Sequence, residues 1–145
     1  MNPSTFVVTP SLFRALLVGS LVLGLVGAVI DVVVPGLVPE VLWQAQAETV
    51  GEEIRLADYV LMVAGLVLLV AAVVSVYGLY MFRGWAPLFS LLVTAATVPL
   101  YPLTGVSISS GWAVGLTEVS MMLWGAVLAF AYAGPLKDRF GGQGR

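Results

Sequence analysis

Three carboxylates within or beside long apolar stretches are the residues of this sequence best suited to chemistry. They are Asp31, Asp58 and Glu118. A charge at the centre of a bilayer costs at least about 2.5 kcal/mol, so an acidic residue in such a stretch is expected to face protein or water. Carboxylates that lie together can share a proton or coordinate a hard cation. With Tyr101 as a polar neighbour, these residues form the candidate site for an ion or a partner.

The residue types that the sequence lacks narrow the function further. The 145 residues include no Cys and no His, and only six are Lys or Arg. Disulfides, thiolate and imidazole metal ligands, and nucleophiles activated by His are therefore excluded. The sequence has no basic stretch of the kind that binds the phosphate backbone of a nucleic acid. We expect a protein that is not an enzyme, with no catalytic residue, no metal site, no cofactor and no nucleic-acid partner.

Four apolar stretches must position the carboxylates, in a sequence that is 60% hydrophobic and 10% charged. The stretch Tyr59–Phe82 has no charged residue. At about 1.5 Å per residue, a helix of this length crosses the roughly 30 Å hydrocarbon core of a bilayer. We predict that residues 1–145 form a single all-α domain, an integral membrane up-down bundle of four transmembrane helices. The predicted spans are about 12–34, 57–82, 86–103 and 112–133.

Polar residues, Gly and Pro predict where these helices begin and end. Ser11 is expected to cap the first helix, and Gly84 to follow the last turn of the second. Pro87 suits the first turn of the third helix. Pro99 removes a backbone hydrogen bond to the carbonyl of Ala95, so it should kink or end that helix.

An alternative for the first span is a cleaved signal peptide. Arg14 precedes an apolar run, and Ala45-Gln46-Ala47 has the small-x-small pattern of a cleavage site. However, the run exceeds the roughly 7–15 residues of a signal-peptide core, and the Ala pair lies far beyond its end. We therefore expect the first span to be retained.

Segment 35–56 is the most acidic part of the sequence and is predicted to lie outside the membrane. Its acidic residues are Glu40, Glu48, Glu52 and Glu53. Val38, Val41, Leu42 and Ala45 recur at helical spacing beside Trp43, which indicates a short helix in the membrane interface. A solvated acidic loop fits the composition equally well.

The basic residues predict the orientation. On one side of the predicted spans lie Arg14, Arg83, Lys137, Arg139 and Arg145, and on the other lies only Arg55. By the positive-inside rule, both termini are cytoplasmic and residues 134–145 form a basic cytoplasmic tail. The segment Leu123–Phe140, a last span ended by Gly134-Pro135 and followed by Lys-Asp-Arg-Phe, is similar to many short bacterial membrane proteins. No function follows from that likeness. The four predicted spans indicate a multi-pass protein of a cell membrane, which we expect to be the bacterial inner membrane.

Small residues predict which faces of the helices touch, because they let two backbones approach closely. The glycines expected at such contacts are Gly24, Gly27, Gly65, Gly111, Gly115 and Gly125. Glu118 lies at helical spacing from Gly111, Gly115 and Gly125, so its side chain is expected to face protein and be mostly buried. By depth, its expected hydrogen-bond partners are Asp31, Asp58, Tyr59 and Tyr101.

Together these patterns predict a non-catalytic integral membrane protein that acts through helix contacts. It would be an accessory subunit, an assembly factor or an inhibitor in a larger membrane complex. Its expected partners are the lipid bilayer and other membrane protein subunits or further copies of itself. The alternative is a small oligomeric channel or transporter for ions or protons that uses Glu118 and the other carboxylates of the outer half.

Overall fold

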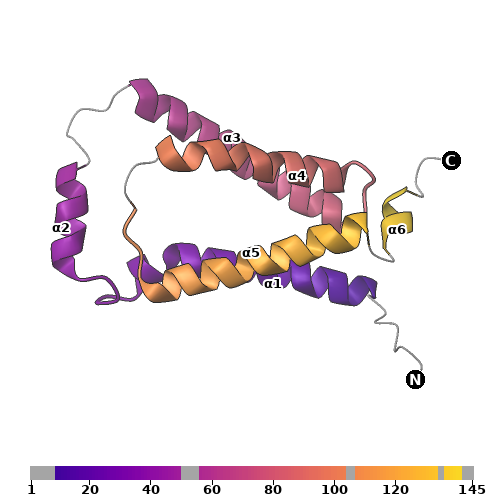
Figure 1. The fold of residues 1–145 in the computed structure, drawn as a ribbon, viewed down its shortest axis with the longest axis horizontal. Helices are drawn as coiled ribbons and strands as arrows, with labels where there is room; N and C mark the ends of the chain where they lie inside the picture. Colours follow the sequence, from indigo (N-terminus) through magenta and orange to yellow (C-terminus); the bar gives the residue numbers. More distant parts are fainter. Residues whose placement is uncertain (1–8, 50–55, 104–106, 134–135, 142–145) are drawn as a thin grey trace.

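The computed structural model describes residues 9–49, 56–103, 107–133 and 136–141, and in these ranges it is helical without strands (Figure 1). The elements in chain order are α1 (Pro10–Val33), α2 (Glu40–Thr49), α3 (Leu56–Tyr80), α4 (Ala86–Thr97), the 3-10 helix η1 (Val98–Leu103), α5 (Gly111–Tyr132) and α6 (Lys137–Gly141). For segment 35–56 the sequence fits either a short helix or a loop, and in the structure residues Glu40–Thr49 are helical.

Four segments are long and apolar enough to cross a membrane, which confirms the prediction of four candidate spans. They are Pro10–Val33, Asp58–Tyr80, Ala86–Leu103 and Gly111–Tyr132. Their mean hydropathy is 2.5, 2.7, 1.5 and 1.6, respectively. The third is the least regular, because the α-helix ends at Thr97 and continues as a 3-10 helix through Pro99 and Pro102. The prediction that Pro99 ends or kinks this helix is therefore confirmed.

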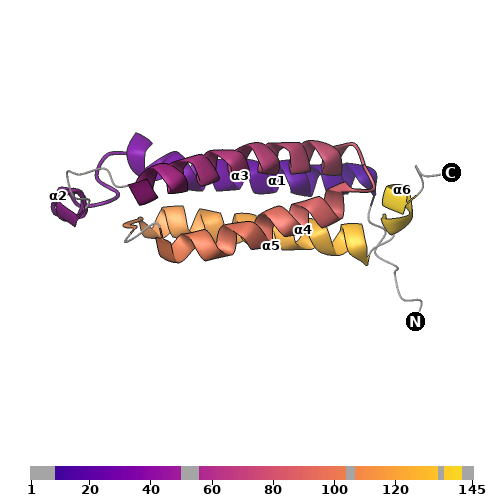
Figure 2. The ribbon, with the colours of Figure 1, turned by 90° about the horizontal axis from the view of Figure 1, so that it is seen from above.

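The long helices are arranged as two pairs. α1 packs along α5, and α3 and α4 form a helical hairpin that lies over the first pair (Figures 1 and 2). In Figure 1 the two pairs approach each other toward α6 and separate toward α2. We call these two ends of the molecule the α6 end and the α2 end.

The hydrophobic core lies at the α6 end. It consists of Phe13, Leu17, Leu79, Phe82, Ala86, Val127, Ala131, Leu136 and Phe140. Three aromatic rings from distant parts of the chain meet there: the ring centroids of Phe13 and Phe82 are 5.4 Å apart, and Phe140 lies 5.8 and 5.3 Å from them. By contrast, no described residue of α3 between Leu56 and Val70 is buried. The two pairs are thus joined mainly at one end.

Two predicted helix ends are wrong, and the structure shows why. Thr9, and not Ser11, caps α1: its hydroxyl accepts a hydrogen bond from the Leu12 amide at 3.2 Å. Pro10 is then the first helical residue, where its missing N–H costs nothing.

The residue that reverses the chain after α3 is Phe82, with φ of 54°, and not Gly84. The Phe82 amide donates to the Leu79 carbonyl at 3.1 Å, and the Arg83 amide donates to the Gly78 carbonyl at 2.9 Å. These two bonds form the Schellman motif, in which glycine usually holds the position of Phe82. The ring contacts of Phe82 in the aromatic core hold it in this left-handed conformation.

Gly84 is required for a different reason. A Cβ there would lie 2.6 Å from the carbonyl oxygen of Phe140, so any larger residue would collide with the backbone of α6. The glycine thus allows the close approach of α6 and does not end α3.

Candidate functional site

The interface between α1 and α5 is built on small residues, and it positions the candidate site at the α2 end. A Cβ on Gly24 would lie 2.9 Å from the Ser120 hydroxyl, and one on Gly27 would lie 2.7 Å from the Thr117 hydroxyl. The Ser120 hydroxyl also donates to the Ser20 carbonyl at 2.7 Å. The backbones can approach this closely because neither glycine has a side chain.

Asp31 follows Gly24 and Gly27 on the same helix and joins the end of α1 to the start of α5. Its carboxylate accepts a hydrogen bond from the Ser110 amide at 2.8 Å and a second one from the Ser110 hydroxyl. The Ser110 hydroxyl in turn accepts from the Ala113 amide at 3.2 Å, as the N-cap of α5. A carboxylate at a helix N-terminus is stabilised by the unpaired amides and by the helix dipole.

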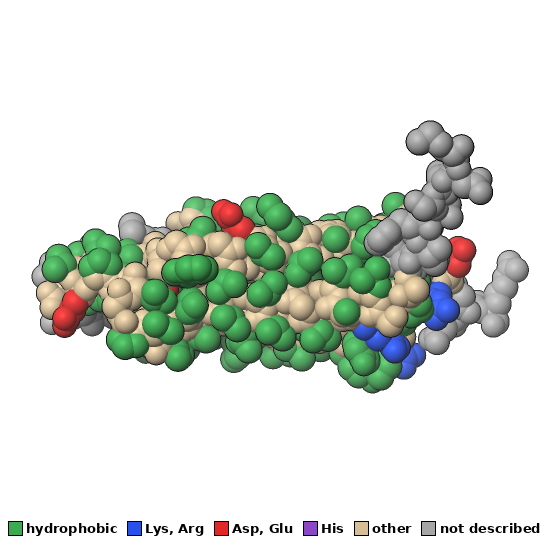
Figure 3. Space-filling view, turned by 90° about the horizontal axis from the view of Figure 1, so that it is seen from below, with side chains coloured by type: hydrophobic (Ala, Val, Ile, Leu, Met, Phe, Trp, Pro, Cys, Tyr) green, Lys and Arg blue, Asp and Glu red, His purple; other side chains and the backbone are tan. Residues whose placement is uncertain are grey.

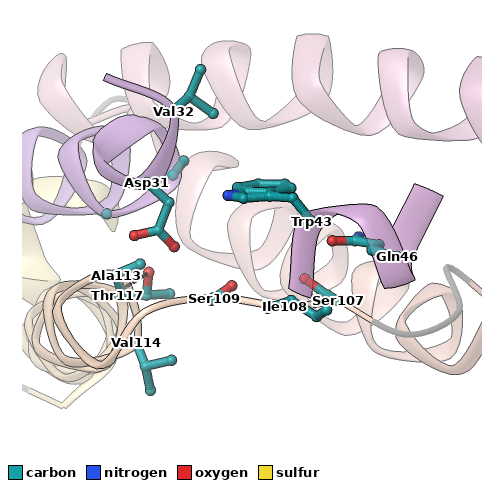
Figure 4. A pocket seen from close by; sticks show the side chains of 12 residues that line it. Asp31, Val32, Trp43, Gln46, Ser107, Ile108, Ser109, Ala113, Val114 and Thr117 are labelled. Carbon is teal, nitrogen blue, oxygen red and sulfur yellow. Dashed lines mark hydrogen bonds between the residues drawn. The ribbon is translucent and has the colours of Figure 1, made fainter. Parts of the chain in front are cut away.

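A cavity of about 440 Å³ opens beside this carboxylate, between the end of α1, α2 and the segment before α5 (Figure 4). We call it the Asp31 cavity. Its lining consists of Gly27, Ala28, Asp31, Val32, Trp43, Gln46, Ser107, Ile108, Ser109, Ala113, Val114 and Thr117. In Figure 4 the Trp43 indole reaches from α2 toward the end of α1, with its nitrogen at the edge nearer Asp31. The cavity therefore combines a carboxylate, an indole and several hydroxyls.

A second hollow of about 590 Å³ adjoins the Asp31 cavity and shares Asp31, Val32 and Trp43 with it. Its remaining lining is Pro35, Gly36, Val38, Pro39 and Glu40. No Lys or Arg occurs among the lining residues of either hollow in the part of the chain that the structure describes.

The expectation that Glu118 is buried against protein is wrong. The residue is exposed on α5, and within the described ranges nothing donates a hydrogen bond to its carboxylate. α5 carries two stripes of small residues, and α1 packs on the one that includes Ala113, Thr117 and Ser120. The other stripe, which we call the Glu118 face, consists of Gly111, Gly115, Glu118, Met122, Gly125 and Ala129, all exposed.

The other predicted site residues do not join Asp31. Asp58, in the first turn of α3, and Tyr101, in η1, are both exposed. Within the described ranges, no group of three or more acidic residues is placed to hold a metal ion. A Cβ at Gly65, Gly111, Gly115 or Gly125 would meet no atom within 4 Å, in contrast to Gly24 and Gly27. The carboxylates of the outer half therefore do not form one cluster.

The main partner of Asp31 was missed, although the sequence contained a signal for it. Ser110 directly precedes the helix that begins at Gly111, and Ser is among the preferred N-cap residues. The sequence pattern places Trp43 only in the short helix expected in the membrane interface. Its place beside Asp31 in the cavity wall depends on the turn through Pro35 and Gly36, where Gly36 has φ of 87°.

The described basic residues lie at the opposite end from the Asp31 cavity, around α6 (Figure 3). The Arg14 guanidinium lies over the rings of Tyr80 and Phe82, at 4.7 and 5.4 Å from their centroids. Its Nε donates to the Tyr80 carbonyl at 3.4 Å. Arg14 is thus held against the end of α3, where its positive charge faces the aromatic rings.

The four apolar helices indicate a multi-pass membrane protein. Comparisons with protein-family models, with curated proteins and with solved structures found no match.

Proposed function

We propose that the protein is a non-catalytic membrane component that acts through helix contacts, as an accessory subunit, assembly factor or inhibitor in a larger membrane complex. The observation that carries this proposal is the Glu118 face of α5. It presents three glycines and one carboxylate to the surroundings of the molecule. Such a surface suits a second helix better than it suits lipid.

Glu118 lies well inside α5 and not at its end. Glu118 lies seven residues after the start of α5 at Gly111, or about 10 Å along the helix axis. A charge that faces lipid costs at least about 2.5 kcal/mol at the centre of the bilayer and less toward the interface, so Glu118 at this depth carries part of that cost. A partner helix with a hydroxyl, amide or basic group at the same depth would remove this cost, and the glycines would let it approach.

The proposed topology is an up-down bundle in a cell membrane, the bacterial inner membrane, with both termini in the cytoplasm. The positive-inside rule supports this orientation, because the described basic residues belong to the start of α1, the turn after α3 and α6: Arg14, Arg83, Lys137 and Arg139. The α2 end, with the Asp31 cavity, would then face the outer side. A reporter fused after Glu48 should be found outside the cytoplasm, and a cytoplasmic reporter would overturn the orientation.

Photocrosslinking in the native membrane tests the helix-contact function. With p-benzoylphenylalanine in place of Met122, on the Glu118 face, irradiation should give an adduct with another membrane protein. The same amino acid in place of Met62, which is 64% exposed on α3 against 73% for Met122, is the matched control. Glu118→Leu should remove the Met122 adduct, whereas Glu118→Gln, which still forms hydrogen bonds, should keep most of it.

Two results would count against a protein partner at this face. The first is an adduct with lipid alone at both positions, and the second is equal yields of protein adduct from Met122 and Met62. Either would show that the glycines and the carboxylate do not select a helix.

A second candidate function is a small oligomeric channel or transporter for ions or protons. The exposure of Glu118 favours it, because a symmetric oligomer formed through the Glu118 face would bring several copies of this carboxylate together. An adduct between two copies of the chain at Met122 would support the oligomer. Flux through reconstituted vesicles that Glu118→Gln leaves unchanged would remove Glu118 from the path.

A further inference from the structure

The Asp31 cavity offers a binding site that is independent of the helix-contact function. It lies at the α2 end, where the hydrocarbon region of a bilayer would give way to the head groups. The volume of the cavity, about 440 Å³, is within the range of small-molecule sites, roughly 300–1,000 Å³. Val32 and Val114 line it as well, and both are exposed. An amphipathic ligand could thus place its polar part in the cavity and its apolar part along these side chains.

Asp31 is fixed in position but not neutralised. Its hydrogen bonds from the Ser110 amide and hydroxyl hold the carboxylate at the start of α5. Both donors are neutral groups, so neither supplies a positive charge to the carboxylate. An ionised carboxylate has about four lone-pair sites, which leaves acceptor capacity for a further donor.

The surroundings of Asp31 favour a positively charged donor. The adjoining hollow adds Glu40 to the same region, and neither hollow is lined by Lys or Arg among the described residues. The described basic side chains lie at the α6 end, the length of the spans away (Figure 3). Ionisable residues within a membrane usually pair with another charged or polar group, and a cation is the complementary partner for a carboxylate.

The other polar groups of the cavity lining favour a ligand that has a hydrogen-bond acceptor close to its positively charged donor. The indole N–H of Trp43 donates only, and its nitrogen lies at the edge of the ring nearer Asp31 (Figure 4). Ser107 and Ser109 contribute hydroxyls, which both donate and accept. An oxygen of the ligand can therefore accept from these groups while its ammonium group donates to Asp31.

We propose that the Asp31 cavity binds a ligand with a primary ammonium group and an acceptor oxygen a few atoms away, the chemistry of an ethanolamine phosphate head group. The ammonium donates to the Asp31 carboxylate, and the phosphate oxygens accept from the Trp43 indole and the serine hydroxyls. A quaternary ammonium of the choline type has no N–H to donate, so the cavity discriminates against it. The source is either a membrane lipid or a soluble amine of the same chemistry.

Native mass spectrometry of the full chain tests this proposal. The protein is released from nanodiscs that contain equal amounts of phosphatidylethanolamine, phosphatidylcholine and phosphatidylglycerol, and the retained lipids are counted. Retention of phosphatidylethanolamine should exceed that of both others. Asp31→Asn should lower it about tenfold, the effect expected when a hydrogen bond to a charged group is lost. Asp58→Asn, which removes a charge on α3 at the same end, is the matched control and should change nothing.

A second variant, Trp43→Phe, and a soluble ligand, O-phosphoethanolamine, test the proposal independently of Asp31→Asn. Trp43→Phe keeps a ring in the cavity wall, removes the N–H and leaves the contacts of Ser110 intact, so it should weaken retention without unfolding α5. Calorimetric titration with O-phosphoethanolamine, with O-phosphocholine as control, distinguishes the sources. Binding of the soluble compound without lipid retention identifies a soluble ligand, and retention of the lipid alone identifies a lipid site.

The proposal fails if phosphatidylcholine or phosphatidylglycerol is retained as well as phosphatidylethanolamine. It also fails if folded Asp31→Asn protein retains the lipid like the unchanged chain. Neither result would affect the helix-contact function, whose test reports on the Glu118 face.

Discussion

Replacement of Gly27 by Ala is expected to weaken the packing of α1 on α5 by about 1 to 3 kcal/mol, the usual cost of overpacking. The added Cβ would lie 2.7 Å from the Thr117 hydroxyl, 3.1 Å from the Ala113 carbonyl oxygen and 3.2 Å from the Thr117 amide nitrogen. A hydroxyl can rotate away, but the other two atoms belong to the backbone. α5 therefore has to move as a helix, which would also shift Ser110 and the Asp31 cavity.

Two other glycines serve as controls for this effect. Gly65→Ala makes the same change in helix propensity, about 1 kcal/mol, where no atom lies within 4 Å of the new Cβ. The difference between the two variants thus isolates the packing cost. Gly24→Ala should be intermediate, because only the Ser120 side chain is close, with its hydroxyl at 2.9 Å.

The measurement is reversible unfolding of the full chain by sodium dodecyl sulfate in mixed micelles, followed by circular dichroism. The unfolding midpoint should fall most for Gly27→Ala, less for Gly24→Ala, and not at all for Gly65→Ala. Equal midpoints for the Gly27 and Gly65 variants would show that α1 and α5 are not packed this closely, and the reasoning would be refuted.

Two further predictions concern the contacts of α4 and α6. The Trp124 indole donates to the Thr94 hydroxyl at 3.2 Å, so Thr94→Val should destabilise the protein by about 0.6 kcal/mol in the same titration. The effect should be smaller once Trp124 is Phe, because only the bond from the Thr94 hydroxyl to the Ser90 carbonyl, at 2.9 Å, is then left to lose. Gly84→Ala should displace α6, because the new Cβ would lie 2.6 Å from the Phe140 carbonyl oxygen. Hydrogen exchange of the α6 amides should then accelerate, whereas Gly111→Ala should leave it unchanged; unaltered exchange in Gly84→Ala would contradict the contact.

The spans could be predicted from the sequence because bilayer thickness sets their length. The predicted first span, 12–34, compares with Pro10–Val33, and the predicted fourth, 112–133, compares with Gly111–Tyr132. Pro99 ends its α-helix for a reason that acts within one turn of the chain. Such local rules need no knowledge of the other helices.

The choice of helix faces could not be predicted in the same way. Helical periodicity identifies a stripe through Gly111, Gly115 and Glu118, but α5 has a second stripe through Ala113, Thr117 and Ser120. Both consist of residues small enough for close packing, and the choice depends on the fit to Gly24 and Gly27 of α1. Periodicity within one helix does not report the fit between two helices. The prediction therefore places Glu118 on the face that contacts protein, whereas the structure has it on the exposed face.

The Asp31 cavity was beyond prediction for a related reason. Asp31 lies at helical spacing from Gly24 and Gly27, and this spacing predicts only that its side chain points toward another helix. Its bond to Ser110 joins positions 79 residues apart, and the position of Trp43 depends on a turn with positive φ at Gly36. Contacts of this range depend on how whole helices are placed and not on local pattern.

The bond from the Ser120 hydroxyl to the Ser20 carbonyl joins residues 100 positions apart. At a synthesis rate of about 5–20 residues per second, α1 enters the membrane roughly 5–20 s before α5 can reach it. During that time α3 and α4, separated by one short turn, can already pair. The glycine face of α1 is meanwhile without its partner helix, so it stays open to other helices until α5 has been made.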